Sequence, residues 1–264
     1  MASGKQSRAE RQRKIAAAAP KQSNTRLIIG VVIAVLAILA ASGVIWVGAR
    51  ESGGAPTAGK DFPAGATGPD GGIVVSGGGV LKPGIPTLDV YADFQCPFCK
   101  VYDGLLGTTV ENLATSGKAN VVHHLKTFLD ANLRNDASKR ASNAAACAAD
   151  AGKFLAYRGI VFANQPANEG DGWSDEQLRI FADQVGVSGP AREAWDTCVK
   201  DGSYRGYLQR VEDASSRAGV LGTPTYRVNG QSMDFKQVKG EPDVLPTFNA
   251  EYARLTGLKG GSNT

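Results

Sequence analysis

Predominantly apolar runs along this chain fall into two length classes. The longest, residues 27–47, continues for 21 residues without a charge. Shorter runs at 73–75, 87–94 and 120–128 have the length and the Val, Leu, Ile and Tyr content of strands. The segment 222–230 ends in Asn229-Gly230, a dipeptide typical of tight hairpins, so we expect a strand before it and a return strand from Gln231 onwards.

Helical patterns fill most of the chain between and beyond these strands. Residues 97–116 predict a helix that is broken early, at Asp103-Gly104. Ser174 and Gln177 form a capping box that opens another helix. Further helices are expected from Asp136 or Ser138 to about Phe162 with a weak point at Gly152, from Pro190, over 204–218 and over 245–255, with a loop at 129–135. This order is that of an α/β domain with a helical block of about 80 residues inserted.

Composition and charge add a second, separate feature. A hydrophobic content of 42% supports a real core and excludes a disordered chain. The net charge of +4 is carried by one end, because residues 1–26 hold seven basic side chains and one acidic one, a charge of +6, so the rest carries −2. Such a basic tail can bind nucleic acid, but here it precedes the long apolar run.

The apolar run at 27–47 is long enough to cross a bilayer as a helix and longer than the core of a typical signal peptide. The basic residues before it predict a cytoplasmic N-terminus, with everything after Arg50 outside the cell membrane. We therefore expect a basic tail at 1–26, a transmembrane helix at 27–48 and a Gly/Pro/Ala-rich tether at 49–72. Small residues at 40–43 leave a cleaved signal peptide as the alternative.

A pair of cysteines follows the strand at 87–94. Pro97 suits the first turn of the next helix, where its missing N–H costs nothing. Free backbone N–H groups and the helix dipole then favour the Cys96 thiolate, and Cys99 returns to the same face at a spacing that allows a disulfide. The alternative is half a zinc site, which needs a second ligand pair that Cys147 and Cys198 are too far apart in sequence to supply.

A strand ending in Cys-Pro-Phe-Cys, a helical block, and then Gly222-Thr-Pro-Thr-Tyr226 with an Asn-Gly hairpin together resemble the thioredoxin superfamily. More narrowly, residues 70–258 are similar to the membrane-anchored DsbA-type disulfide oxidoreductases of actinobacteria, in their mycobacterial-like form. The resemblance implies an α/β thioredoxin fold over 73–258 with a helical insertion at about 130–219. One transmembrane helix precedes this domain and a flexible tail, 259–264, follows it.

The resemblance also assigns the site, which comprises Cys96, Pro97, Phe98, Cys99, Thr223 and Pro224. Cys96 is the nucleophile that forms a mixed disulfide with substrate, and Cys99 is the leaving group. Pro224 is expected to be cis, which brings the backbone of Thr223 within reach of a sulfur or a substrate strand. Phe98 stands where the best-known DsbA pattern has His, so one contributor to thiolate stabilisation is missing, and Thr223 replaces Val, as in the isomerase branch.

Two acidic residues and two histidines lie on the predicted core strands. Asp93, three residues before Cys96, is the nearer candidate, ahead of Asp89, for a proton acceptor for Cys99, and a solvated carboxylate at the strand end is the alternative. His123 and His124 are adjacent on one strand and point to opposite faces, so we expect structural roles for them.

Two further groups of residues carry expectations. Cys147 and Cys198 are predicted to form a structural disulfide, worth roughly 4 kcal/mol for a loop of about 50 residues. The alternative is that one of them is a second redox relay. An apolar surround for the redox disulfide is expected from four aromatic residues, with core packing favoured for the first two: Tyr91, Phe94, Phe98 and Tyr226.

These features together favour a monomeric oxidase that donates the Cys96–Cys99 disulfide to newly exported proteins, without cofactor, resident metal or nucleic acid. The resemblance implies re-oxidation by a DsbB- or VKOR-like membrane enzyme. A disulfide isomerase or reductase on the same fold is the first alternative. A copper-binding metallochaperone is the second, although the only methionines are Met1 and Met233.

Overall fold

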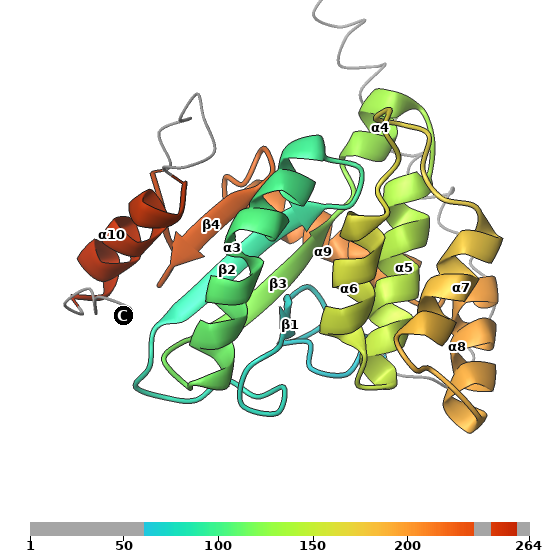
Figure 1. The fold of residues 1–264 in the computed structure, drawn as a ribbon, viewed down its shortest axis with the longest axis horizontal. Helices are drawn as coiled ribbons and strands as arrows, with labels where there is room; N and C mark the ends of the chain where they lie inside the picture. Colours follow the sequence, from blue (N-terminus) through green and yellow to red (C-terminus); the bar gives the residue numbers. More distant parts are fainter. Residues whose placement is uncertain (1–60, 235–243, 258–264) are drawn as a thin grey trace, which may run out of the picture. The chain divides into compact units, whose positions relative to one another are not determined.

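A five-stranded sheet of order β1-β3-β2-β4-β5 carries the cysteine motif (Figure 1). The computed structural model of the protein describes residues 61–234 and 244–257. The strands are β1 (Ile73–Val74), β2 (Thr87–Asp93), β3 (Asn120–Lys126), β4 (Thr225–Val228) and β5 (Gln231–Ser232). β2 is parallel to β3 and antiparallel to β4, so the strand that leads into the cysteines is central. β1 is an edge strand, as predicted, and Asn229 and Gly230 both have positive φ in the hairpin turn.

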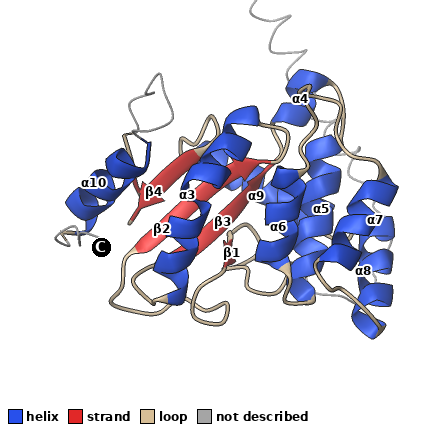
Figure 2. Ribbon diagram, viewed as in Figure 1, coloured by secondary structure: helices blue, strands red, loops and turns tan. Residues whose placement is uncertain are grey.

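Helices occupy three parts of the chain (Figure 2). They are α3 (Pro97–Thr115), α4 (Leu129–Leu133), α5 (Ala137–Asp150), α6 (Phe154–Ala163), α7 (Asp175–Gln184), α8 (Pro190–Asp201), α9 (Arg205–Arg217) and α10 (Val244–Thr256). Six of these, α4 to α9, lie between β3 and β4 in the chain. The Ser174–Gln177 capping box and the break at Gly152, where φ is +68°, are both confirmed.

Two apolar cores hold these elements together. The first lies where α3 and α10 cover the sheet and contains Leu88, Val90, Leu106, Val110, Tyr226 and Phe248. The second is formed mainly by α5 to α9 and reaches the sheet at Ala92 and Leu125. Cys96 and Cys99 belong to the second cluster, so the cysteine motif lies where the helical block meets the end of β2.

Three sequence expectations need correction. α3 runs unbroken through Gly104, and the Asp103 carboxylate pairs with Arg158 of α6. Residues 129–133 form the short helix α4 and not a loop. Neither Asp136 nor Ser138 caps α5 with its side chain; the Asp130 carboxylate accepts the backbone N–H groups of Ser138 and Lys139 instead, at 2.7 and 3.0 Å.

The N-terminal region is described only from residue 61. Residues 61–72, expected to belong to a flexible tether, are held against α9, because Arg210 donates to the carbonyls of Asp61 and Pro69 and Tyr207 donates to that of Gly71. The predicted basic tail and apolar run at 1–48, and the predicted tail at 259–264, lie outside the described residues. No helix within 61–234 and 244–257 has both the length and the apolar character needed to cross a membrane.

Candidate active site

Cys96 stands at the N-terminus of helix α3. It is the N-cap residue, with an extended backbone, and Pro97 follows in the first turn. Its carbonyl oxygen accepts the N–H of Cys99 at 3.1 Å, which returns Cys99 to the same side of the helix. Both cysteines are free thiols and both are buried, with 6% of Cys96 and 2% of Cys99 exposed. The structure therefore shows the dithiol form of the motif.

The two thiols have opposite acidities. A hydrogen bond from the Cys99 thiol is the main cause that lowers the pKa of Cys96 to about 6; burial opposes it, while Thr223 and the backbone N–H groups of Cys99 and Phe98 act in the same direction. Burial, followed by the neighbouring Cys96, raises the pKa of Cys99 well above its usual value. At neutral pH the site is thus a Cys96 thiolate that accepts a hydrogen bond from a Cys99 thiol.

The loop before β4 faces Cys96 from the other side. The Thr223–Pro224 peptide bond is cis. The Cys96 Sγ atom lies 3.4 Å from the Thr223 carbonyl oxygen, within range of a thiol hydrogen bond. The Thr223 hydroxyl is buried and has no hydrogen-bond partner. It can therefore donate a hydrogen bond to the Cys96 thiolate. Cys96, Cys99, Thr223 and Pro224 are therefore brought together.

Asp93 is fully buried, and its carboxylate is bonded to groups other than the cysteines. It accepts hydrogen bonds from the Ser138 hydroxyl at 2.5 Å and from the backbone N–H groups of Gln95 and Leu129 at 2.9 and 3.2 Å. Burial raises its pKa to about 7 in spite of these donors. Its backbone N–H, and not its carboxylate, is among the groups that act on the pKa of Cys99, which it lowers. The carboxylate thus joins the end of β2 to α4 and α5, a geometry that opposes the predicted role as proton acceptor.

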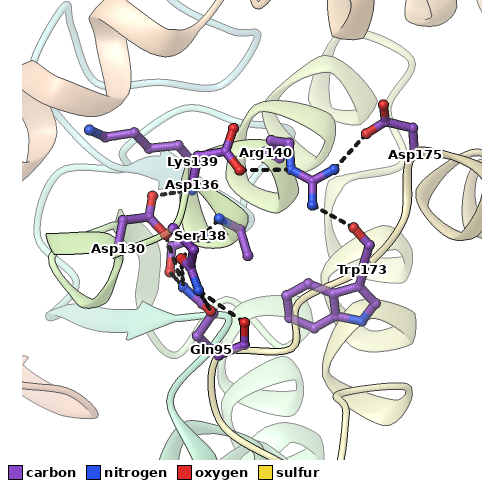
Figure 3. A network of polar contacts seen from close by, with 11 residues as sticks. Gln95, Asp130, Asp136, Ser138, Lys139, Arg140, Trp173 and Asp175 are labelled. Carbon is purple, nitrogen blue, oxygen red and sulfur yellow. Dashed lines mark hydrogen bonds and ion pairs between the residues drawn. The ribbon is translucent and has the colours of Figure 1, made fainter. Parts of the chain in front are cut away.

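A buried polar network surrounds Gln95, two residues after Asp93, and Figure 3 shows Gln95 beside Asp130 and Ser138. The Gln95 side-chain nitrogen lies 2.9 Å from Asp130 Oδ1, 3.0 Å from Asn135 Oδ1 and 2.8 Å from Ser138 Oγ. Asn135 in return donates to the Gln95 side-chain oxygen at 2.9 Å. These contacts fix the residue that directly precedes Cys96. Sequence reasoning missed them, because nothing local pairs Gln95 with a segment 35 to 43 residues away.

Gln165 is a second residue that sequence reasoning missed. It follows α6, and its side-chain nitrogen donates to the carbonyls of Phe94 and Cys96 at 2.6 and 3.0 Å. Lys100, on the first turns of α3, donates to the Gln165 carbonyl at 3.3 Å. The helical block therefore holds the active-site turn from two directions.

The aromatic residues divide between surface and core. Phe98 is 67% exposed at the mouth of the site. Tyr91 and Phe94 are buried, in line with the preferred expectation for them. The expectation that Tyr226 surrounds the redox disulfide is wrong. Tyr226 is 4% exposed and packs edge-on against Phe248 in the core, so it is not available to substrate. Two aliphatic residues, Val101 and Leu221, are exposed instead and were not predicted.

The remaining candidates have structural contacts. Cys147 and Cys198 are joined by a disulfide between α5 and α8. His123 is buried, with its ring near that of Phe154, while His124 stacks on Tyr91 and bonds Asp89 on the neighbouring strand at 2.9 Å. Asp89, the second acidic candidate, is thereby turned away from the cysteines.

Comparison with known proteins agrees with this geometry. The profile of the family described as Thioredoxin matches residues 85–240, more than half of the chain. The chain belongs to the thioredoxin family. No curated protein matches the chain. Among solved structures, reduced DsbG of Mycobacterium tuberculosis, a disulfide bond oxidoreductase, is similar with 27% identity and a TM-score of 0.56, covering 72% of this chain and 89% of that one.

Two further structures extend the comparison. Oxidised DsbA of Mycobacterium tuberculosis shares 26% identity with a TM-score of 0.53, covering 67% of this chain and 88% of that one. MdbA of Corynebacterium diphtheriae, a thiol-disulfide oxidoreductase, shows the same fold at 20% identity and a TM-score of 0.56, covering 72% and 94%. With the Cys96–Cys99 dithiol at a helix N-terminus beside a cis-proline, this thioredoxin-family chain is a protein disulfide oxidoreductase of the DsbA type.

Proposed function

We propose that this protein is an extracytoplasmic thiol oxidase that donates the Cys96–Cys99 disulfide to newly exported proteins. The observation that carries the proposal is the position of the Cys96 sulfur, at the N-terminus of α3 and beside Cys99 and the Thr223 loop. This environment lowers the pKa of Cys96 to about 6. A pKa one unit below neutrality favours the reduced enzyme by about 1.4 kcal/mol at pH 7. That difference corresponds to roughly 30 mV of oxidising power.

The reaction follows from the positions of the two sulfurs. A substrate thiolate attacks the Cys96 sulfur of the enzyme disulfide, and the Cys96–Cys99 bond breaks with its electron pair on Cys99. Cys99 then takes a proton, because burial keeps the pKa of its thiol high. A second substrate thiolate attacks the mixed disulfide and expels Cys96, which is stable as the thiolate. The substrate leaves with a disulfide and the enzyme as a dithiol.

The surface around Cys96 suits unfolded substrate segments. Phe98, Val101 and Leu221 are 67%, 40% and 80% exposed, and the first two lie three residues apart on α3. Leu221 precedes the Thr223 loop that touches Cys96. Exposed apolar side chains beside a reactive sulfur favour binding of apolar segments that folding will later bury.

The location and partners belong to the same proposal. The uncharged run at 27–47 and the charge of +6 before it support a single transmembrane helix with a cytoplasmic N-terminus. The oxidoreductase domain, with its helices between β3 and β4 as an insertion, then works as a monomer outside the membrane. A DsbB- or VKOR-like membrane oxidase would restore its disulfide. Intact cells are first treated with a membrane-impermeant reductant, which opens the disulfide only outside the membrane. Labelling of Cys96 by a membrane-impermeant maleimide then tests this topology, and protection until lysis would contradict it.

A disulfide isomerase or reductase is the second candidate. It is favoured by the buried Thr223 hydroxyl beside Cys96 and by the likeness to DsbG. Copper binding has less support, since no three His, Cys, Asp or Glu side chains of the described ranges gather where they could hold a metal ion.

The deciding measurement is the reduction potential of the full-length protein against a series of glutathione buffers, followed by thiol alkylation and mass. A potential of about −120 to −180 mV supports the oxidase, and refolding of a reduced substrate protein then separates oxidase from isomerase. A potential below about −250 mV would overturn the proposal and identify a reductase supplied with electrons from across the membrane.

A further inference from the structure

The carbonyl oxygen of Cys96 accepts a hydrogen bond from outside its own helix. Within α3 the backbone N–H groups of Cys99 and Lys100 already donate to this oxygen, at 3.1 and 3.4 Å. These are the bonds that an N-cap carbonyl makes with the first turn of its helix. A further donor, the side-chain nitrogen of Gln165, lies 3.0 Å from the same oxygen and comes from the segment that follows α6. The helical insertion thus contacts the backbone of the nucleophilic cysteine directly.

The same side-chain amide bridges the whole turn that precedes Cys96. The Gln165 nitrogen also lies 2.6 Å from the carbonyl oxygen of Phe94. An amide nitrogen carries two hydrogens, so one is available for each carbonyl. Phe94 follows the last residue of β2, and Cys96 is the N-cap of α3. One side chain therefore fixes both ends of the turn that joins the strand to the helix.

The backbone of Gln165 is itself held in place. Its N–H donates to the carbonyl of Phe162 at 3.1 Å, and the Trp173 ring nitrogen donates to the carbonyl of the preceding residue, Asn164, at 2.9 Å. The carbonyl of Gln165 accepts a hydrogen bond from the Lys100 ammonium group of α3 at 3.3 Å. The amide is therefore a supported contact between the insertion and α3, and such support is what keeps a reactive group in its productive geometry.

The acidity of Cys96 depends on where this turn lies. The backbone N–H groups of Cys99 and Phe98, together with Thr223, lower the pKa of Cys96. Hydrogen bonds weaken steeply with distance and misalignment, so a displaced turn would lose part of this stabilisation. Gln165 bonds the Cys96 carbonyl and so acts on the sulfur through the backbone.

This support stabilises the reduced form more than the disulfide. The Cys96 sulfur carries a negative charge only as a thiolate, and the N–H dipoles at a helix N-terminus favour negative charge. In the disulfide neither sulfur is charged, so the same dipoles contribute little. We propose that Gln165 is a positioning residue for dithiol exchange, through which the helical insertion sets the oxidising strength of the Cys96–Cys99 disulfide.

The experiment measures two properties of the full-length protein. The pH dependence of iodoacetamide alkylation gives the pKa of Cys96, and equilibration with glutathione buffers gives the reduction potential. In Gln165→Ala, water can bond the two carbonyls but cannot hold them in place. We expect the pKa of Cys96 to rise by about one unit, the size of the net contribution of one hydrogen bond. The equilibrium with glutathione should shift about tenfold toward the enzyme disulfide, which makes the protein roughly 30 mV less oxidising.

Two further variants separate positioning from structural damage. Asn164→Ala is the matched control, because its exposed side-chain amide donates to the Ile160 carbonyl of its own helix, at 2.9 Å. It should keep the wild-type pKa of Cys96 and the wild-type potential. Gln165→Met keeps the length of the side chain without either donor and should reproduce both shifts of Gln165→Ala. Urea unfolding of each variant measures the loss of stability separately.

An unchanged pKa and potential in Gln165→Ala, whatever its loss of stability, would identify a purely structural contact and overturn the inference. If the alanine variant does not fold, Gln165→Met decides the question in the same way. Equal shifts in Asn164→Ala would also overturn it, because they would assign the effect to the end of α6 and not to the Gln165 amide.

The inference rests on dithiol exchange, which oxidase, isomerase and reductase share. Its test is the difference between variant and wild type, whereas the oxidase proposal is decided by the wild-type potential. A wild-type potential that excludes the oxidase would therefore leave the role of Gln165 standing. The absence of a difference between the proteins would leave the oxidase proposal untouched.

Discussion

The Cys96 Sγ atom lies 3.4 Å from the carbonyl oxygen of Thr223, although 127 positions separate the two residues in the chain. One side of the contact is the start of α3, set by the end of β2. The other is the loop that leads into β4, and β2 and β4 are hydrogen-bonded neighbours in the sheet. The register of this strand pair thus places a cysteine and a peptide carbonyl together without any local sequence signal.

Replacing Thr223 by valine should raise the pKa of Cys96. The variant keeps the shape and the backbone carbonyl but removes the side-chain hydroxyl of Thr223, which lowers the pKa of Cys96. A hydrogen bond to a charged group contributes about 1.5–3 kcal/mol, so we expect a rise of about one pH unit or more. The pH dependence of iodoacetamide alkylation at Cys96 measures it.

Thr225→Val is the matched control for that experiment. The Thr225 hydroxyl, at the start of β4, donates to the Gly222 carbonyl in the preceding loop at 2.8 Å and not to a sulfur. We expect the pKa of Cys96 in this variant to stay near that of wild type. Equal shifts in both variants would mean that the loop conformation, and not the Thr223 hydroxyl, sets the acidity.

Replacing the exposed apolar residues at the site by serine should weaken binding of large protein substrates and leave the reaction with small thiols unchanged. Phe98→Ser and Leu221→Ser remove surface that is 67% and 80% exposed, so folding should be little affected. We expect KM for a reduced, unfolded protein to rise several-fold, since each buried apolar side chain is worth about 1.5–3 kcal/mol at most. The rate with glutathione, which is too small to use this surface, should be unchanged. Ile180→Ser, on α7, is the control, and a slower glutathione reaction in Phe98→Ser would argue against a binding role.

The sequence predicts the parts of this site that are formed by residues close together in the chain. The strand before Cys96, Pro97 in the first turn of α3 and the return of Cys99 are all local, and the Ser174–Gln177 capping box is local too. The orientation of the Asp93 carboxylate is not local, because its partners Ser138 and Leu129 come from helices 36 to 45 residues away. The same holds for Gln95 and Gln165. Asp103, expected to break α3, is instead accommodated by Arg158, 55 residues further on.

Removing the Cys147–Cys198 disulfide should lower stability without changing the chemistry of the site. The bond closes a loop with a sequence separation of 51 residues, for which the chain-entropy model gives roughly 4 kcal/mol. We expect the Cys147→Ala/Cys198→Ala variant to lose about that much free energy of unfolding in urea. The alkylation rate of Cys96 in the folded variant should equal that of wild type. A large change in that rate would support a redox link between the two cysteine pairs.

Asp93 should make the stability of the domain decrease with rising pH. In the folded protein burial raises the pKa of this carboxyl to about 7, from its ordinary value of 3.8. Between these two values the folded state binds more protons than the unfolded state, so the free energy of unfolding falls as pH increases. The slope from this one group approaches about 1.4 kcal/mol per pH unit. Below about pH 4 none of the stability contributed by protonated Asp93 is lost, and above about pH 7 all of it is lost.

Asp93→Asn isolates this contribution, because asparagine has no charge to bury. Its side-chain oxygen can still accept from Gln95 and Ser138, but its NH₂ group then faces the backbone N–H of Leu129, so the variant should be the less stable protein at pH 5. As pH rises to 8 the wild type loses the stability of its protonated Asp93 and the gap should close or reverse. Urea unfolding of both proteins at pH 5, 6.5 and 8 measures the gap. A gap that stays constant with pH would mean that Asp93 is ionised throughout and that its three donors outweigh its burial.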